Sequence, residues 1–119
     1  DDDKDDNSLL FDGILVDVPC TATGTASKNP DVLRKDFVTP RNSKEEDGTS
    51  TTSSCYLDDL LETQRNILHH CTKHLLAVDG IMIYSTCSIL QQESEDQIHQ
   101  FLKQQQQQHG DNDDESGRR

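Results

Sequence analysis

Two short apolar segments rich in β-branched residues constrain the fold of this chain more than any other feature. Residues 9–18 and residues 81–85 each read as a buried strand, because they are short, apolar and bordered by turn-forming residues. Between them lies one clear helical pattern, Leu57–Leu76, in which apolar side chains recur at three- and four-residue intervals. A strand, a helix and a second strand in this order predict an α/β unit with two parallel strands.

A cysteine follows each predicted strand: Cys20 follows the first and Cys87 the second. The carboxyl ends of parallel strands meet at one edge of the sheet, where open α/β sheets place their ligands. A lone cysteine is more often a small buried apolar side chain than a nucleophile, but the equivalent positions of these two favour a functional role. If a helix begins near Ser88, its N-terminus would lower the pKa of the Cys87 thiol and favour the thiolate.

Three segments contain almost nothing that could be buried. Residues 1–8 read as an acidic lead-in, residues 39–54 as a low-complexity insertion, and residues 104–119 as a disordered, Gln-rich acidic tail. The partial domain that remains, residues 9–103, ends in a predicted helix from about Gln91 to Lys103. Such a thin core leaves the sheet edges and one sheet face uncovered, so we expect that the chain does not fold stably by itself.

The net charge of −12 argues against this chain binding nucleic acid alone, because its surface repels phosphates. No apolar run is long enough for a membrane span and no secretory signal is present, so we expect reduced thiols and an intracellular location, with cytoplasm, nucleolus and organelle not distinguished. The chain does not begin with Met, which suggests an internal piece. His70 and His74 have a spacing that can bind metal, but an exposed helix end is the simpler reading, and we expect no metal.

Two motifs carry a family resemblance. Residues 16–25, Val-Asp-Val-Pro-Cys-Thr-Ala-Thr-Gly-Thr, resemble the Asp-x-Pro-Cys motif of the NOP/Sun family of RNA (cytosine-5) methyltransferases. Residues 84–89, Tyr-Ser-Thr-Cys-Ser-Ile, with Glu93 and Glu95 after them, resemble that family's Thr-Cys motif, and residues 61–68 resemble its helix with a Gln. The subgroup resembled most is the Sun type, which acts on small-subunit ribosomal RNA. The resemblance implies the carboxyl-side portion of a Rossmann-like methyltransferase domain that uses S-adenosylmethionine.

The resemblance also implies roles for individual residues. Cys87 matches the nucleophile that adds to C6 of the target cytosine, and Cys20 matches the thiol that helps to release the methylated product. Asp17 matches the carboxylate between the cytosine and S-adenosylmethionine, and Pro19 shapes the turn before Cys20. Apart from the resemblance, Lys28 belongs to the basic residues near this loop and is a candidate contact to a phosphate of the RNA substrate, expected to be ribosomal RNA, although a simply solvated side chain is the favoured reading.

The chain also departs from the family pattern. No strand with a Gly-rich turn for the cofactor precedes Leu9, and the acidic residue for the cofactor ribose and the RNA-binding region have no counterpart. The alternative to an RNA methyltransferase is therefore a truncated, inactive fragment that acts, if at all, as an acidic interaction segment. We expect that this chain alone is inactive.

Overall fold

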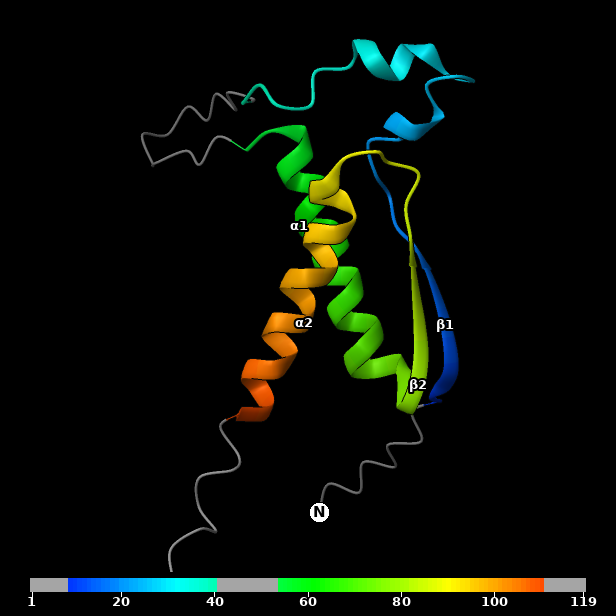
Figure 1. Ribbon diagram of the computed structural model, residues 1–119, viewed down its shortest axis with the longest axis vertical. Coiled ribbons are helices and arrows are strands. Elements are labelled where there is room, and N and C mark those ends of the chain that lie inside the picture. Colours follow the sequence, from blue (N-terminus) through cyan, green and yellow to red (C-terminus); the bar gives the residue numbers. More distant parts are fainter. Residues whose placement is uncertain (1–8, 41–53, 111–119) are drawn as a thin grey trace, which may run out of the picture.

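The computed structural model describes residues 9–40 and 54–110. Within them, the chain forms the elements β1 (Phe11–Asp17), α1 (Tyr56–His70), β2 (Leu76–Ser85) and α2 (Glu95–Gly110). The two strands pair in parallel, as the sequence predicts, and α1 and α2 lie together on one side of them (Figure 1). The α/β strand–helix–strand arrangement is therefore confirmed.

Helix α1 follows the predicted pattern closely. It begins at Tyr56, after Cys55 and Asp58 form a reciprocal cap at its first turn, and it continues beyond His70 as a π-helical turn, Cys71–Leu75. The predicted helix, Leu57–Leu76, thus differs by one residue at each end. A short 3₁₀ helix, Pro30–Arg34, follows the first loop and begins with the proline, as expected for a residue that fixes φ.

Strand β2 begins earlier than the sequence suggests. It includes Leu76, which pairs with Phe11, whereas the next aligned pair is Gly13 with Ile81. The extra residues between Leu76 and Ile81 form a bulge in which Asp79 adopts a left-handed conformation, with φ of 63°. This left-handed conformation is taken by Asp79 and not by the neighbouring Gly80.

The predicted end of the last helix is also wrong. A 3₁₀ turn, Gln91–Glu93, precedes α2, and α2 continues past Lys103 through the glutamine run to Gly110. Glutamine has a good helix propensity, and Gln104 is further anchored because its Oε1 lies 2.8 Å from Nε2 of His69. The first part of the expected disordered tail is therefore helical. The expected acidic lead-in, most of the expected insertion and residues 111–119 lie outside the described residues.

One face of the strand pair carries the core and the other is open. Val16 of β1 and Leu68 of α1 are buried at 4% and 0% exposure, and Phe101 of α2 packs nearby at 9%. On the opposite face Leu15 and Ile83 are 70% and 59% exposed. The prediction of an uncovered sheet face is therefore confirmed for the described residues.

Among the helices that the structure describes, none combines the length and the apolar character that crossing a bilayer requires.

Candidate active site

The two strand-end cysteines meet. Asp17 and Ser85, the last residues of β1 and β2, are opposite each other in the sheet, and the N–H of Val18 donates to the carbonyl of Ser85 at 3.2 Å. The loops that follow both strands consequently leave at the same end (Figure 1). The Sγ atoms of Cys20 and Cys87 lie 3.1 Å apart; both thiols are free, with Cys20 half-buried and Cys87 exposed.

The pKa values of these two thiols are shifted in opposite directions. Burial alone raises the pKa of Cys20, but hydrogen bonds from Thr86 and from the Cys87 thiol, with backbone hydrogen bonds, outweigh burial and leave this pKa below its usual value. The pKa of Cys87 is raised, first by its hydrogen bond to Cys20 and then by burial and by the negative charge of Cys20. Of the two thiols, Cys20 is therefore the one that loses its proton more readily.

The expected effect of a helix N-terminus on Cys87 is wrong. No helix begins near Ser88 in the structure: the 3₁₀ turn begins at Gln91 and α2 at Glu95. Ser88 instead makes two hydrogen bonds within the loop: its N–H donates to Oγ1 of Thr86 at 3.2 Å, and its Oγ accepts from the N–H of Leu90 at 3.0 Å. The partner that sets the pKa of Cys87 is thus Cys20 and not a helix dipole.

Gly24 brings the two loops into close contact. Its N–H donates to the carbonyl oxygen of Cys87 at 2.9 Å. A Cβ at this position would lie 2.6 Å from that oxygen, far inside van der Waals contact. Gly24 has no positive φ, so the site requires glycine for the close approach rather than for an unusual backbone conformation.

The other predicted site residues lie at the end of β1 and on the loop that follows it. Asp17 is exposed at the end of β1, and its charge adds to the causes that raise the pKa of Cys87. Pro19 is exposed and directly precedes Cys20. Lys28 is exposed on the same loop, beyond the 3₁₀ turn Thr23–Thr25.

Sequence reasoning missed a buried polar cluster beneath Cys20. Glu93 and Gln64 are both 0% exposed. Oε1 of Glu93 accepts from the N–H of Thr21 at 2.9 Å and from Nε2 of Gln64 at 3.1 Å, and Oε2 accepts from the Thr21 hydroxyl at 2.7 Å. The signal was present in the sequence: Gln64 lies on the apolar stripe of α1, between Leu60 and Leu68, and a polar side chain on a buried stripe must find partners.

Gln64 is the centre of this cluster. Its Nε2 also donates to the carbonyl of Pro19 at 2.9 Å, and its Oε1 accepts from Nε2 of Gln97 at 3.0 Å. Tyr84 donates to the carbonyl of Glu93 at 2.7 Å and lies 3.4 Å from Oε1 of Gln64. Burial raises the pKa of Tyr84 to about 12, and the negative charges of Glu93 and Cys20 contribute.

A hydroxyl cluster connects the two thiol-bearing loops. The hydroxyl oxygens of Thr21, Thr23 and Ser88 lie 3.2 Å from one another, and Oγ1 of Thr23 accepts from the N–H of Ile89 at 3.1 Å. Across the described residues, no buried side-chain polar atom lacks a hydrogen-bond partner. The loops are thus held together by directional bonds as well as by packing.

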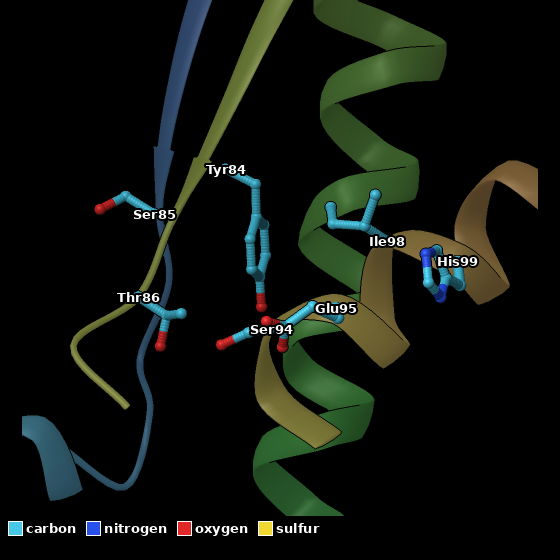
Figure 2. A pocket seen from close by; sticks show the side chains of 7 residues that line it. All are labelled: Tyr84, Ser85, Thr86, Ser94, Glu95, Ile98 and His99. Atoms are coloured by element: carbon cyan, nitrogen blue, oxygen red, sulfur yellow. The ribbon is translucent and has the colours of Figure 1, made fainter. Parts of the chain in front are cut away.

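A cavity of about 490 Å³ lies beside the thiol pair rather than around it. Its walls come from the end of β2 and the start of α2: Tyr84, Ser85, Thr86, Ser94, Glu95, Ile98 and His99. Figure 2 shows Tyr84 reaching from its strand toward Ser94, with Ile98 and His99 on the opposite wall. Thr86 connects this cavity to the thiols, because it lines the cavity and also hydrogen-bonds Cys20.

No group of three or more potential metal ligands occurs among residues 9–40 and 54–110. The imidazole rings of His70 and His74 do lie side by side, with their centroids 4.9 Å apart.

Comparisons with known proteins extend this description. A family model described as "16S rRNA methyltransferase RsmB/F" matches residues 1–116. The chain is 42% identical over 94 residues to the ribosomal RNA small subunit methyltransferase B of Shewanella oneidensis, and 35% identical over 92 residues to that of Xylella fastidiosa; each match covers 77% of this chain and 18% of the relative. The crystal structure of PH0851 superposes with a TM-score of 0.57 at 31% identity, over 77% of this chain and 17% of that one.

The chain has a thiol pair at the carboxyl edge of a parallel strand pair, and it is similar to proteins named methyltransferases. These two findings define a protein of the α/β methyltransferase class. Within this class, the chain belongs to the 16S rRNA methyltransferase RsmB/F family. The chain spans 18% of the length of the curated relatives it matches.

Proposed function

We propose that the complete protein transfers a methyl group to C5 of a cytosine in ribosomal RNA through a covalent adduct between Cys87 and C6 of that base. The observation that carries this proposal is the 3.1 Å approach of the Cys20 and Cys87 sulfurs at the carboxyl edge of the sheet, in a member of this family. Covalent addition divides one difficult alkylation into easier steps.

The proton arrangement of the pair suits this order of events. In this order of events, the Cys87 thiol gives its proton to the Cys20 sulfur as the Cys87 sulfur bonds to C6; the 3.1 Å contact between the sulfurs and the raised pKa of Cys87 support this direction of transfer. The electron pair of the C5–C6 double bond then moves to C5. S-adenosylmethionine, when bound, supplies the methyl group that C5 takes up. Water then takes the C5 proton, the bond between the Cys87 sulfur and C6 breaks, and the double bond is restored. Cys20 assists this release by returning its proton to the departing Cys87 sulfur.

Asp17 fits a binding role at this edge. Its carboxylate is exposed at the end of β1 and its charge acts on Cys87, which supports a place for it beside the base and the methyl donor. A carboxylate there can accept hydrogen bonds from the cytosine amino group or from a donor group of S-adenosylmethionine, and it is the described residue that we propose for the cofactor. Pro19 holds the turn beneath the base, and Lys28 contacts an RNA phosphate after the base has left its stack.

The test uses the complete protein and RNA that contains 5-fluorocytosine. Release requires loss of a proton from C5, and the fluorine at this position cannot be removed in that way, so the adduct persists. The wild-type protein should form a stable adduct that needs the methyl donor, and Cys87→Ala should form none. Cys20→Ala should accumulate an adduct even with natural RNA, because release is slowed. An adduct that survives Cys87→Ala would overturn the assignment, and no adduct from the wild-type protein would favour the inactive alternative.

A further inference from the structure

Two buried side chains hold Cys20 from both sides. The carbonyl of Pro19, just before Cys20, accepts from Nε2 of Gln64 at 2.9 Å, and the N–H of Thr21, just after it, donates to Oε1 of Glu93 at 2.9 Å. Gln64 and Glu93 also bond each other at 3.1 Å. The backbone on each side of Cys20 is therefore attached to one joined pair, which comes from α1 and from the turn before α2.

The hydrogen-bond pattern gives each member of this pair a defined chemical form. Glu93 accepts from three donors, the pattern of an ionised carboxylate. The amide of Gln64 uses both of its N–H groups as donors, which an acid or a hydroxyl could not do. Because both side chains are 0% exposed, a substitution that removes a partner leaves a buried polar group unsatisfied.

The same pair is connected to the loop of Cys87. Tyr84, which precedes that loop in β2, donates to the carbonyl of Glu93 at 2.7 Å, and Thr21 shares a 3.2 Å contact with the hydroxyl of Ser88. An apolar pair of similar volume could stabilise the fold equally well, since buried charges give little net stability. Because hydrogen bonds are directional, the polar pair also fixes where the backbone of Cys20 lies relative to Cys87.

We propose that Gln64 and Glu93 are a positioning pair that fixes the backbone on both sides of Cys20 and so holds its sulfur against that of Cys87. Neither side chain is found bonded to either sulfur, so they act through the backbone rather than as catalytic residues. The consequence for methyl transfer rests on the proposed function, but the positioning itself concerns only the geometry and reactivity of the thiols.

The test measures thiol chemistry without RNA or cofactor. The complete protein is treated with diamide, which takes two electrons and two protons from the thiols and leaves a disulfide between Cys20 and Cys87, quantified by peptide mass spectrometry. Gln64→Glu and Glu93→Gln should each slow this reaction about tenfold, because a displacement of the order of 1 Å separates the reacting atoms. Each should also raise the pH at which Cys20 is alkylated.

Two further variants separate positioning from general stability. Asp59→Asn removes an exposed carboxylate in the first turn of α1 and should leave the rate unchanged. The double exchange of Gln64→Glu with Glu93→Gln restores one amide-to-carboxylate bond, so it should react at least about threefold faster than Gln64→Glu alone. Wild-type disulfide rates in both single variants, or no recovery in the double exchange, would overturn the proposal.

Folding and function remain distinguishable in this design. Glu93→Gln keeps the size of the side chain, so if Gln64→Glu fails to fold, Glu93→Gln alone decides by the same rate and pH profile. If the wild-type protein forms no RNA adduct while the single variants slow disulfide formation, the proposed function fails and the positioning pair stands. If the adduct forms normally in both single variants and their disulfide rates are unchanged, the positioning pair fails and the proposed function stands.

Discussion

Replacing Gly24 by alanine tests whether the contact between the two loops sets the geometry of the thiol pair. The new Cβ would lie 2.6 Å from the carbonyl oxygen of Cys87 and 3.3 Å from its carbonyl carbon. Ordinary contact begins at 3.4 Å, so the peptide of Cys87 must retreat by about 0.8 Å. Misplacement on this scale costs of the order of 10²-fold in rate, whereas overpacking costs only about 1–3 kcal/mol of unfolding free energy.

The assay is adduct formation with 5-fluorocytosine RNA, with urea unfolding measured in parallel. We expect Gly24→Ala to remain folded and to form the adduct about 10- to 100-fold more slowly. Gly13→Ala is the matched control, because a Cβ at Gly13 meets no atom within 4 Å. Wild-type rates in Gly24→Ala, or an equal loss in Gly13→Ala, would refute the claim that this contact positions Cys87.

Further predictions concern stability and ionisation. Leu68 is 0% exposed, so Leu68→Ala should lower the free energy of urea unfolding by about 2–5 kcal/mol, whereas Leu15→Ala on the open sheet face, where Leu15 is 70% exposed, should change it by less than about 0.5 kcal/mol. Alkylation followed against pH should show Cys20 reacting at lower pH than Cys87, since the shared hydrogen bond lowers one pKa and raises the other; coincident profiles would contradict this pairing. The neutral phenol of Tyr84 should stabilise the fold fully below pH 10.0, and this stabilisation should be lost as the pH rises through about 12. A phenolate absorbance that is complete by pH 10.0 would contradict the burial of Tyr84.

The strand–helix–strand order was predictable because it depends on local periodicity. Apolar spacing located α1 together with the π-helical turn after it to within one residue at each end, and two short β-branched runs indicated the two strands, although β2 begins earlier than its run. Parallel pairing then brought Cys20 and Cys87 to one edge without further information. The bulge at Asp79 and the extension of α2 to Gly110 were missed, because they depend on strand register and on a contact between His69 and Gln104.

The environment of the thiols was not predictable in the same way. The sequence suggested a helix N-terminus as the cause of a reactive Cys87, whereas its acidity follows from a 3.1 Å contact with a residue distant in the chain. The burial of Glu93 was likewise hidden, because a glutamate near a helix start usually reads as an exposed partner of the helix dipole. Local propensities do not specify such contacts; only the packed loops do.

The central claim is that Cys87 forms the bond to the base, while Cys20 accepts the proton of the Cys87 thiol and later returns it. The most direct measurement is to incubate the complete wild-type protein with S-adenosylmethionine and 5-fluorocytosine RNA, digest both, and identify the peptide that carries the nucleotide by mass spectrometry. We predict that the nucleotide is found on the peptide containing Cys87. A nucleotide attached to the peptide containing Cys20 would contradict the account.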